Sequence, residues 1–113
     1  MDAPPFATSV ATLELEPWPL DPAQVIEGEP KVRGRILHAD DQVERGVWEH
    51  TPGVSRDVEA DELFVVLSGR ATVEFDEGGV LELGPGDVGV VPAGAHTTWH
   101  VHETLRKVFQ TRR

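Results

Sequence analysis

Short stretches in which hydrophobic and polar residues alternate recur along the chain from Lys31 to its end. Such alternation, rich in β-branched and aromatic residues, is typical of strands that bury one face. The stretches are separated by turn-forming sequences and recur about every eight to twelve residues, a spacing typical of sandwiches and barrels. The pattern predicts an all-β domain with strands at Lys31–His38, Val43–His50, Leu63–Ser68, Arg70–Phe75, Val80–Leu83, Val88–Val91, Thr97–His102 and Leu105–Gln110.

One predicted strand departs from the alternation, because Leu63–Leu67 is apolar at every position. One of its faces would line the core, whereas the other must be covered by a second sheet, the N-terminal arm or another subunit. We expect a homodimer formed through this sheet.

The first thirty residues have a different composition. Six of the 9 prolines lie there, at positions 4, 5, 17, 19, 22 and 30, and every glycine except Gly28 lies beyond them. This composition predicts an extended, Pro-rich N-terminal arm over 1–30 and a barrel over 31–113. Within the arm, Thr12–Leu15 is a candidate edge strand. Asp21 as N-cap followed by Pro22 predicts about one turn of helix.

The composition restricts the classes of function. The 113 residues suffice for one domain, and the absence of cysteine excludes disulfides and thiolate catalysis. The formal net charge of −10 repels phosphate backbones and anionic membranes. The sequence contains neither a signal-peptide pattern nor an apolar run long enough for a membrane helix. We therefore expect a soluble cytoplasmic protein with neither nucleic acid nor membrane as a partner.

Two spaced motifs resemble those of the cupin superfamily. Glu62 to Gly69 follows the pattern E-x6-G, and Gly86 to Gly94 follows G-x5-P-x-G. The resemblance covers residues 31–111 and implies a double-stranded β-helix, the cupin jelly-roll barrel. With Trp48, the run Trp99–Glu103 and the pair Arg106-Lys107, the chain resembles small cupins grouped with ureidoglycine aminohydrolase and the ethanolamine-utilisation cupins, many of which have no assigned function.

The resemblance also implies where a metal would bind. Metal-binding cupins carry H-x-H-x3–4-E in the first motif and a third histidine after P-x-G. Here Glu62 matches the glutamate and Thr97 occupies the third histidine position. The other two positions fall on Arg56 and Val58 or on Ser55 and Asp57, depending on the gap. Since none is histidine and a metal site needs three or four ligands, the family's standard site is absent. A divalent transition metal would need substitutes, of which Glu62, His50 and His96 are the candidates.

Strand parity restricts which other side chains reach the interior. If Thr97 points inward, a regular strand aims His96 away from the pocket, and a bulge at Gly94-Ala95 would reverse this. His50 shares its parity with Trp48 and reaches the barrel mouth if the tryptophan faces inward. Arg106 and Lys107 have opposite parity, so at most one faces inward, and an inward Arg106 would suit a carboxylate-bearing ligand. The alternative for the histidines is a solvated position on the polar face of a sheet.

Two hypotheses for the function follow. In the first, the chain is an enzyme that hydrolyses or isomerises a small polar metabolite, with Glu62 as general base and His50 or His96 as its acid partner or as a metal ligand. In the second, it is a non-catalytic cupin that holds a small molecule without a metal. Both place the ligand among apolar and polar side chains of the barrel, with Trp48, Phe64, Thr97, Trp99 and Arg106 as candidate contacts.

Overall fold

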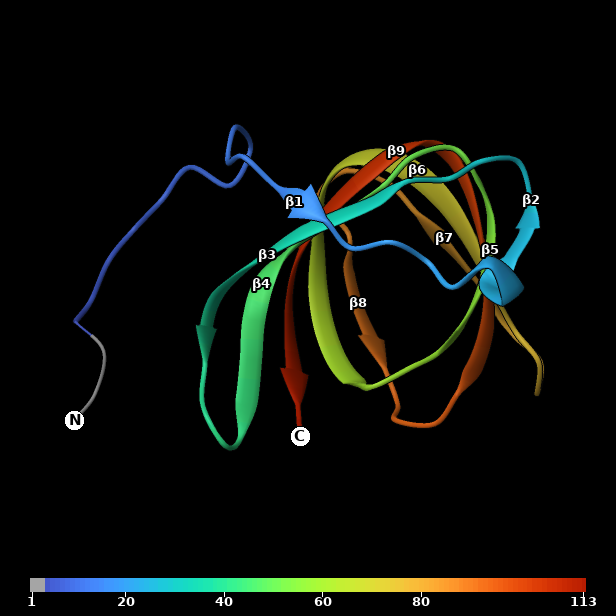
Figure 1. Cartoon of the computed structure of the whole chain (residues 1–113). Coiled ribbons are helices and arrows are strands. Elements are labelled where there is room, and N and C mark those ends of the chain that lie inside the picture. The colour runs from blue at the N-terminus through green and yellow to red at the C-terminus, as the bar shows by residue number, and fades with distance from the viewer. Residues whose placement is uncertain (1–3) are drawn as a thin grey trace.

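A computed structural model describes residues 4–113 of the chain, which form nine strands and one short 3-10 helix (Figure 1). In chain order these elements are β1 (Glu16–Pro17), η1 (Pro22–Gln24), β2 (Val25–Glu27), β3 (Val32–Ala39), β4 (Val43–His50), β5 (Gly53–Val58), β6 (Asp61–Phe75), β7 (Val80–Leu83), β8 (Val88–Val91) and β9 (His96–Arg112). The all-β class predicted from the alternation is confirmed. Within the described residues no helix is long and apolar enough to cross a membrane.

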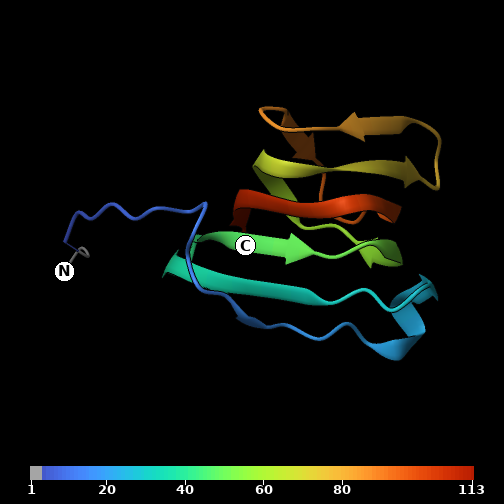
Figure 2. The same cartoon turned by 90° about the horizontal axis from the view of Figure 1, so that it is seen from above.

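Two long strands, β6 and β9, form the centre of the curled sheet. They pair with each other antiparallel, and the two halves of each strand take different outer neighbours. Residues 105–112 of β9 pair with β4, whereas residues 96–101 pair with β5. Residues 62–65 of β6 pair with β8, and residues 71–74 pair with β7. In Figure 2, β9 accordingly lies between β4 and β6.

The strict alternation of side chains along these strands separates an interior from an exterior. Glu62, Phe64 and Val66 of β6 are buried, whereas Leu63 between them is 48% exposed. The buried aromatic and aliphatic side chains form one core, because every second position of each strand faces the same side. This core consists of Phe64, Val66, Ala71, Val73, Leu83, Val91, Trp99, Val101, Leu105 and Phe109.

The exterior of β6 and β8 remains apolar. Besides Leu63, Val88 and Val90 are 61% and 69% exposed. The sequence predicts that a second sheet, the arm or another subunit covers this face. The described chain leaves these three side chains exposed, so the homodimer stays a prediction.

Two predicted strand breaks are wrong. The turn predicted at Ser68-Gly69 lies inside β6, and the gap predicted between His102 and Leu105 lies inside β9. The pairing of these strands shifts register three times between Val66 and Ala71, so the strands bend without ending. Gly69 has a φ of +89°, and a Cβ there would collide with the carbonyl of Thr104. A glycine that reads as a turn signal in the sequence therefore permits a bend in a continuous ribbon.

The strands predicted from the sequence also do not include β5 (Gly53–Val58). Its sequence, Gly-Val-Ser-Arg-Asp-Val, has polar residues on both faces and begins with the glycine of the Pro52-Gly53 pair, which is typical of a loop. Pairing with β9 and β2 nevertheless holds it in the sheet. Hydrogen bonds from neighbouring strands outweigh its weak intrinsic preference.

The first thirty residues are not simply an extended arm, since part of them joins the sheet. The edge strand predicted at Thr12–Leu15 is displaced to β1, which pairs with Arg33 and Gly34 of β3. The predicted helical turn is confirmed as η1. The Asp21 side chain accepts a hydrogen bond from the Ala23 amide, and Pro22 opens the turn. Strand β2 follows at once and extends the sheet beside β5.

Candidate functional site

A cavity of about 330 Å³ opens into the interior of the barrel. Its size is at the lower end of the range found for small-molecule pockets. The walls combine aromatic and ionisable side chains from the inner faces of several strands, among them Trp48, Asp57, Glu59, Glu62, Trp99 and Lys107. A larger groove of about 1040 Å³ runs outside the barrel beside residues 4–8 and the apolar exterior of β6. The inner cavity gathers four ionisable side chains, Asp57, Glu59, Glu62 and Lys107, against tryptophan walls inside the barrel, so it is the candidate site.

A buried ion pair, Lys107 with Glu62, lies in the wall of the cavity. The Lys107 Nζ donates to Glu62 Oε2 at 2.6 Å, and the lysine is only 4% exposed. Nζ also lies 4.5 Å from the ring centroids of Trp48 and Phe64 and 4.8 Å from that of Trp99. Three aromatic faces and one carboxylate thus replace the water that an ammonium normally requires.

Glu59 is a second buried carboxylate, held by two side chains of β9. Its Oε2 accepts hydrogen bonds from Thr97 Oγ1 at 2.7 Å and from Trp99 Nε1 at 3.0 Å. The backbone of Glu59 is held by the loop of the second motif, since its amide donates to the Ala95 carbonyl and its carbonyl accepts from the Gly94 amide. Gly94 adopts a φ of +85°, which explains the glycine at the end of this motif. The motif therefore places an acid in the barrel.

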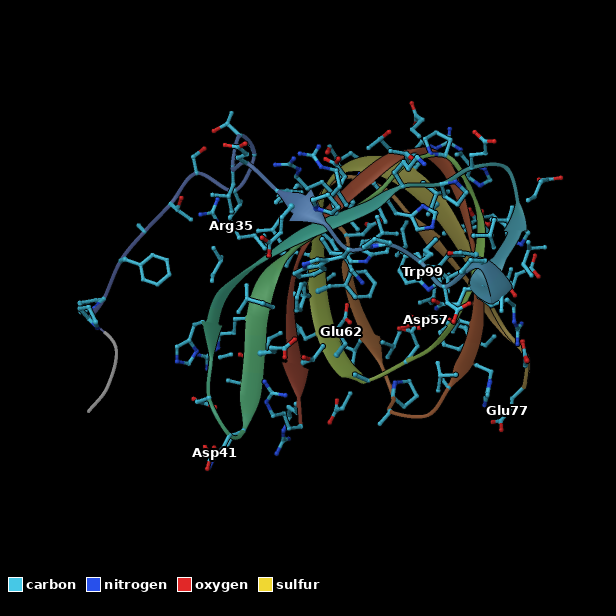
Figure 3. The ribbon with its side chains drawn as sticks, in the orientation of Figure 1. Arg35, Asp41, Asp57, Glu62, Glu77 and Trp99 are labelled. Carbon is cyan, nitrogen blue, oxygen red and sulfur yellow. The ribbon has the colours of Figure 1, made fainter. Side chains whose placement is uncertain are left out.

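Asp57 lies where the cavity meets solvent (Figure 3). The surrounding protein removes part of the hydration of its carboxyl group, and the nearby Glu59 adds negative charge. Together they raise the pKa of Asp57 to about 6. Its amide neighbour, the Val58 N–H, donates to Oδ1 at 2.8 Å and opposes the shift. Asp57 can thus both accept and release a proton near neutral pH.

His50 is buried and fully hydrogen-bonded. Its Nδ1 lies 2.6 Å from the Thr51 carbonyl oxygen, which can only accept, so Nδ1 carries the proton. Burial lowers the pKa of His50, and the Lys107 ammonium lowers it further, so the ring is neutral. Its Nε2 then accepts from the Ser55 hydroxyl at 2.8 Å. This arrangement leaves neither ring nitrogen free for a ligand.

The structure brings most of the predicted site residues together. Glu62, Trp48 and Trp99 line the cavity. Phe64 and Thr97 are fully buried behind it, Phe64 against Lys107 and Thr97 against Glu59. His50 contacts the Trp48 ring at a centroid distance of 5.4 Å.

Two candidates lie outside the cavity. His96 is exposed on the outer face of β9, next to the buried Thr97, so no bulge reverses the alternation. Arg106 is also turned outward. It pairs with Glu49 at 2.9 Å and donates to the carbonyl oxygens of Val10, Ala11 and Leu13. The inward residue of the Arg106-Lys107 pair is the lysine, so Arg106, a candidate ligand contact, does not reach the cavity.

The interior does not fit the metal site of the superfamily. Of the two possible alignments of the motif histidines, the inward-facing one falls on Ser55 and Asp57. These residues pair across the sheet with the inward Trp99 and Thr97. The matching glutamate, Glu62, is bonded to Lys107. Among residues 4–113, no three His, Cys, Asp or Glu side chains converge as a ligand set. A protein cation thus lies against the carboxylate that matches the motif.

Lys107, Glu59 and Asp57 are the site residues that the sequence interpretation omits. Lys107 had a detectable signal, since it alternates with Leu105 and Phe109 on the apolar face of its strand. Asp57 stands at one of the open ligand positions of the first motif. Glu59 has no comparable signal, because it lies just after β5, at an unspecified position of the first motif between Asp57 and Glu62.

The family model described as EutQ-like cupin domain matches residues 37–109. Among solved structures, the EutQ protein of Clostridium difficile is 15% identical, with a TM-score of 0.73 over 94% of this chain and 85% of that chain. A putative ethanolamine utilization protein Q of Salmonella typhimurium is 18% identical, with a TM-score of 0.64 over 73% of this chain and 69% of that chain.

A protein of unknown function from Pseudomonas syringae, assigned to the DUF861 family, is 28% identical. Its TM-score is 0.78 over 88% of this chain, which spans only 44% of the Pseudomonas chain. No curated protein matches the sequence. The matches confirm the cupin jelly-roll fold that the two motifs predict.

Proposed function

We propose that this chain, which belongs to the EutQ-like cupin domain family, binds a small polar metabolite in its barrel without a metal. The bound metabolite then exchanges a proton with Asp57. The observation that carries the proposal is the ion pair of Lys107 and Glu62 beside the cavity. It places an ammonium of the protein, already paired with Glu62, where the superfamily's ligands would gather around a metal.

Glu62 is a poor general base in this arrangement. Its Oε2 accepts a 2.6 Å bond from an ammonium that has no other carboxylate partner among residues 4–113. The bond occupies Oε2, so this oxygen is not free to take a proton from a ligand. Asp57 has the opposite environment, with a pKa raised to about 6, and it faces both solvent and cavity. We therefore assign the proton transfer to Asp57, and to Glu62 the task of holding Lys107.

Non-catalytic binding is the second candidate. It is favoured by the hydrogen bonds that already occupy His50 and Glu59, because groups held in this way are poorly placed to move protons. The two candidates differ in one measurable property, which is whether the bound molecule exchanges hydrogen with solvent.

The test starts with a thermal-shift screen of small amines, amides, ureides and sugar acids at pH 6. A ligand present at a hundred times its Kd should stabilise the protein by about 2.7 kcal/mol. Each hit is then incubated with the protein in D₂O and followed by NMR. The proposal predicts deuterium incorporation or conversion, reduced at least tenfold by Asp57→Asn.

Asp41→Asn is the matched control. Asp41 is an exposed aspartate in the β3–β4 turn, far from the cavity (Figure 3). Exchange that is equal in Asp57→Asn and Asp41→Asn would exclude Asp57 as the exchanging group. Binding without any exchange would establish the non-catalytic candidate. A screen without a single stabilising compound would count against both.

A further inference from the structure

From the charges, the open acceptors and the aromatic walls of the cavity, we infer that its ligand is a small amine bound as the ammonium ion. The inference deepens the proposed function and rests on the same cavity. It concerns the class of molecule that the cavity selects, independently of whether a proton is exchanged.

Several donors around the cavity are already used within the protein. The Trp99 indole N–H and the Thr97 hydroxyl donate to Glu59, and the neutral His50 accepts a hydrogen bond from the Ser55 hydroxyl. Lys107 gives one N–H to Glu62 and turns its ammonium toward three aromatic rings. The donors left for a ligand are the other N–H groups of Lys107 and the indole N–H groups of Trp18 and Trp48.

Acceptors remain available. Oε2 of Glu59 takes both of its hydrogen bonds, which leaves Oε1 without a donor among residues 4–113. Glu59 is only 6% exposed and lines the cavity, so a ligand reaches this oxygen from the cavity side. Asp57 adds an oxygen at the mouth, since only Oδ1 is bonded to the backbone. A ligand that donates hydrogen bonds would find both oxygens open.

The charges favour the same ligand. Three carboxylates line the cavity, Asp57, Glu59 and Glu62, against one inward cation, Lys107. Arg56 contributes no second cation to the interior, because its guanidinium donates to Asp76 at 2.7 Å and to Thr98 at 2.8 Å. An incoming carboxylate would meet an excess of negative charge, whereas an ammonium would neutralise it.

The walls are also suited to a cation. Trp18, Trp48, Trp99 and Phe109 line the cavity, and aromatic faces attract ammonium groups. The same barrel already holds one desolvated ammonium against three rings, that of Lys107. A carboxylate-bearing ligand, which an inward Arg106 would have suited, loses its support because Arg106 faces outward.

The experiment compares three probes of similar size that differ in charge, 1-propylamine, 1-propanol and propionate. Binding is followed at pH 7.5 by the NMR shifts of the Trp99 indole N–H and of the Asp57 amide. We expect 1-propylamine to bind at least tenfold more tightly than 1-propanol and propionate to leave both signals unchanged. Propionate binding as tightly as the amine, or no binding of the amine up to 100 mM, would overturn the inference.

Substitution of the carboxylates tests whether their charge, rather than the shape of the cavity, attracts the amine. Asp57→Asn should weaken amine binding at least threefold and Glu59→Gln at least fivefold, whereas the exposed Asp41→Asn and Glu77→Gln should change nothing. Asp57 is exposed, so its variant keeps the test valid even if Glu59→Gln fails to fold. Equal amine affinity in Asp57→Asn and wild type would contradict the inference.

The pH dependence provides an independent check. The groups that surround Asp57 are Glu59, Glu62 and Lys107 on the cavity side and Asp21, Arg56 and His96 in the recess outside it. Because the pKa of Asp57 is about 6, amine affinity should fall at least twofold between pH 7.5 and pH 5, and this fall should be absent in Asp57→Asn. If the amine bound but its hydrogens did not exchange with solvent, only the proposed proton transfer would be refuted. If propanol or propionate bound more tightly than the amine, only the inference of an amine ligand would be refuted.

Discussion

Lys107 and Arg106 are neighbours on β9, and each pairs with a glutamate of an adjacent strand, but on opposite faces of the sheet. Lys107 points inward to Glu62 among three aromatic rings. Arg106 points outward to Glu49 and to three carbonyl oxygens of the N-terminal segment. One step of strand alternation therefore separates a charge that shapes the cavity from a charge that fastens the chain outside the barrel.

The two environments explain the two residue types. A planar guanidinium presents several N–H donors in fixed directions and can hold a carboxylate and several carbonyls at once. A compact ammonium fits against ring faces and a single carboxylate, and no water is needed to complete the arrangement. If the two residues were swapped, the larger guanidinium would not fit the interior. The lysine on the outer face would have too few N–H donors for Glu49 and the three carbonyl oxygens.

The largest effect is expected from removal of the inward cation. Lys107→Met leaves the 8%-exposed Glu62 as an unpaired buried carboxylate, so the free energy of unfolding should fall by about 3 to 5 kcal/mol. Urea denaturation at pH 7 measures this fall. Adding Glu62→Leu should recover most of it, because two apolar side chains can replace a buried pair at little cost.

Arg113→Met is the control for this measurement. It removes the exposed ion pair of Arg113 with Glu44, which contributes about 1 kcal/mol or less. If Lys107→Met were no more destabilising than Arg113→Met, the inner pair would not be the buried interaction that the geometry shows.

A smaller effect is expected from the outward cation. Arg106→Met removes the pairing with Glu49 and the bonds to Val10, Ala11 and Leu13, at a cost of about 1.5 to 3 kcal/mol, because water can partly replace the arginine. Hydrogen exchange should accelerate in residues 10–15 and remain slow in β6. Arg106→Lys should retain stability from the pair with Glu49 but still show fast exchange in the arm. Slow exchange in both variants would show that other contacts hold the segment.

The same comparison shows what the sequence could predict. Spaced glycines, a proline and Glu62 identified the barrel, since these residues meet local backbone requirements that are visible in a single chain. Parity showed that only one of Arg106 and Lys107 could face inward. The choice between them depended on the aromatic rings of Trp48, Phe64 and Trp99, which come from three strands and meet only in the fold.

Glu59 and Asp57 were harder to recognise for a different reason. Asp57 belongs to a strand without apolar alternation, and Glu59 follows its end, so neither lies in an alternating hydrophobic pattern. Their importance arises from pairing with β9 and from the backbone bonds to Gly94 and Ala95, which connect segments about 35 residues apart in the chain. Long-range proximity of this kind leaves no local signal.

The smallest effect concerns Asp57, which lies between the two environments, at the boundary of interior and solvent. Its pKa is about 6 in the fold against an ordinary value of 3.8, so the native state binds the proton more tightly than the unfolded chain. The stabilisation that this proton provides is complete below pH 3.8 and is lost as the pH rises through about 6. Asp57→Asn, which is neutral throughout, should therefore be more stable than wild type above pH 6, and this margin should vanish near pH 4.

Solvent at the cavity mouth screens the carboxylate, so the margin should stay below about 1 kcal/mol. Paired thermal melts of wild type, Asp57→Asn and Asp41→Asn between pH 4 and 8 measure it. The pKa of His50 is lowered in the fold, so every variant loses stability as the pH falls below about 6.5. This loss is the same in all three proteins and cancels when their stabilities are subtracted. A margin that grew toward acid pH would mean that Asp57 is stabilised as the anion, and that the cavity mouth is less negative than its three carboxylates indicate.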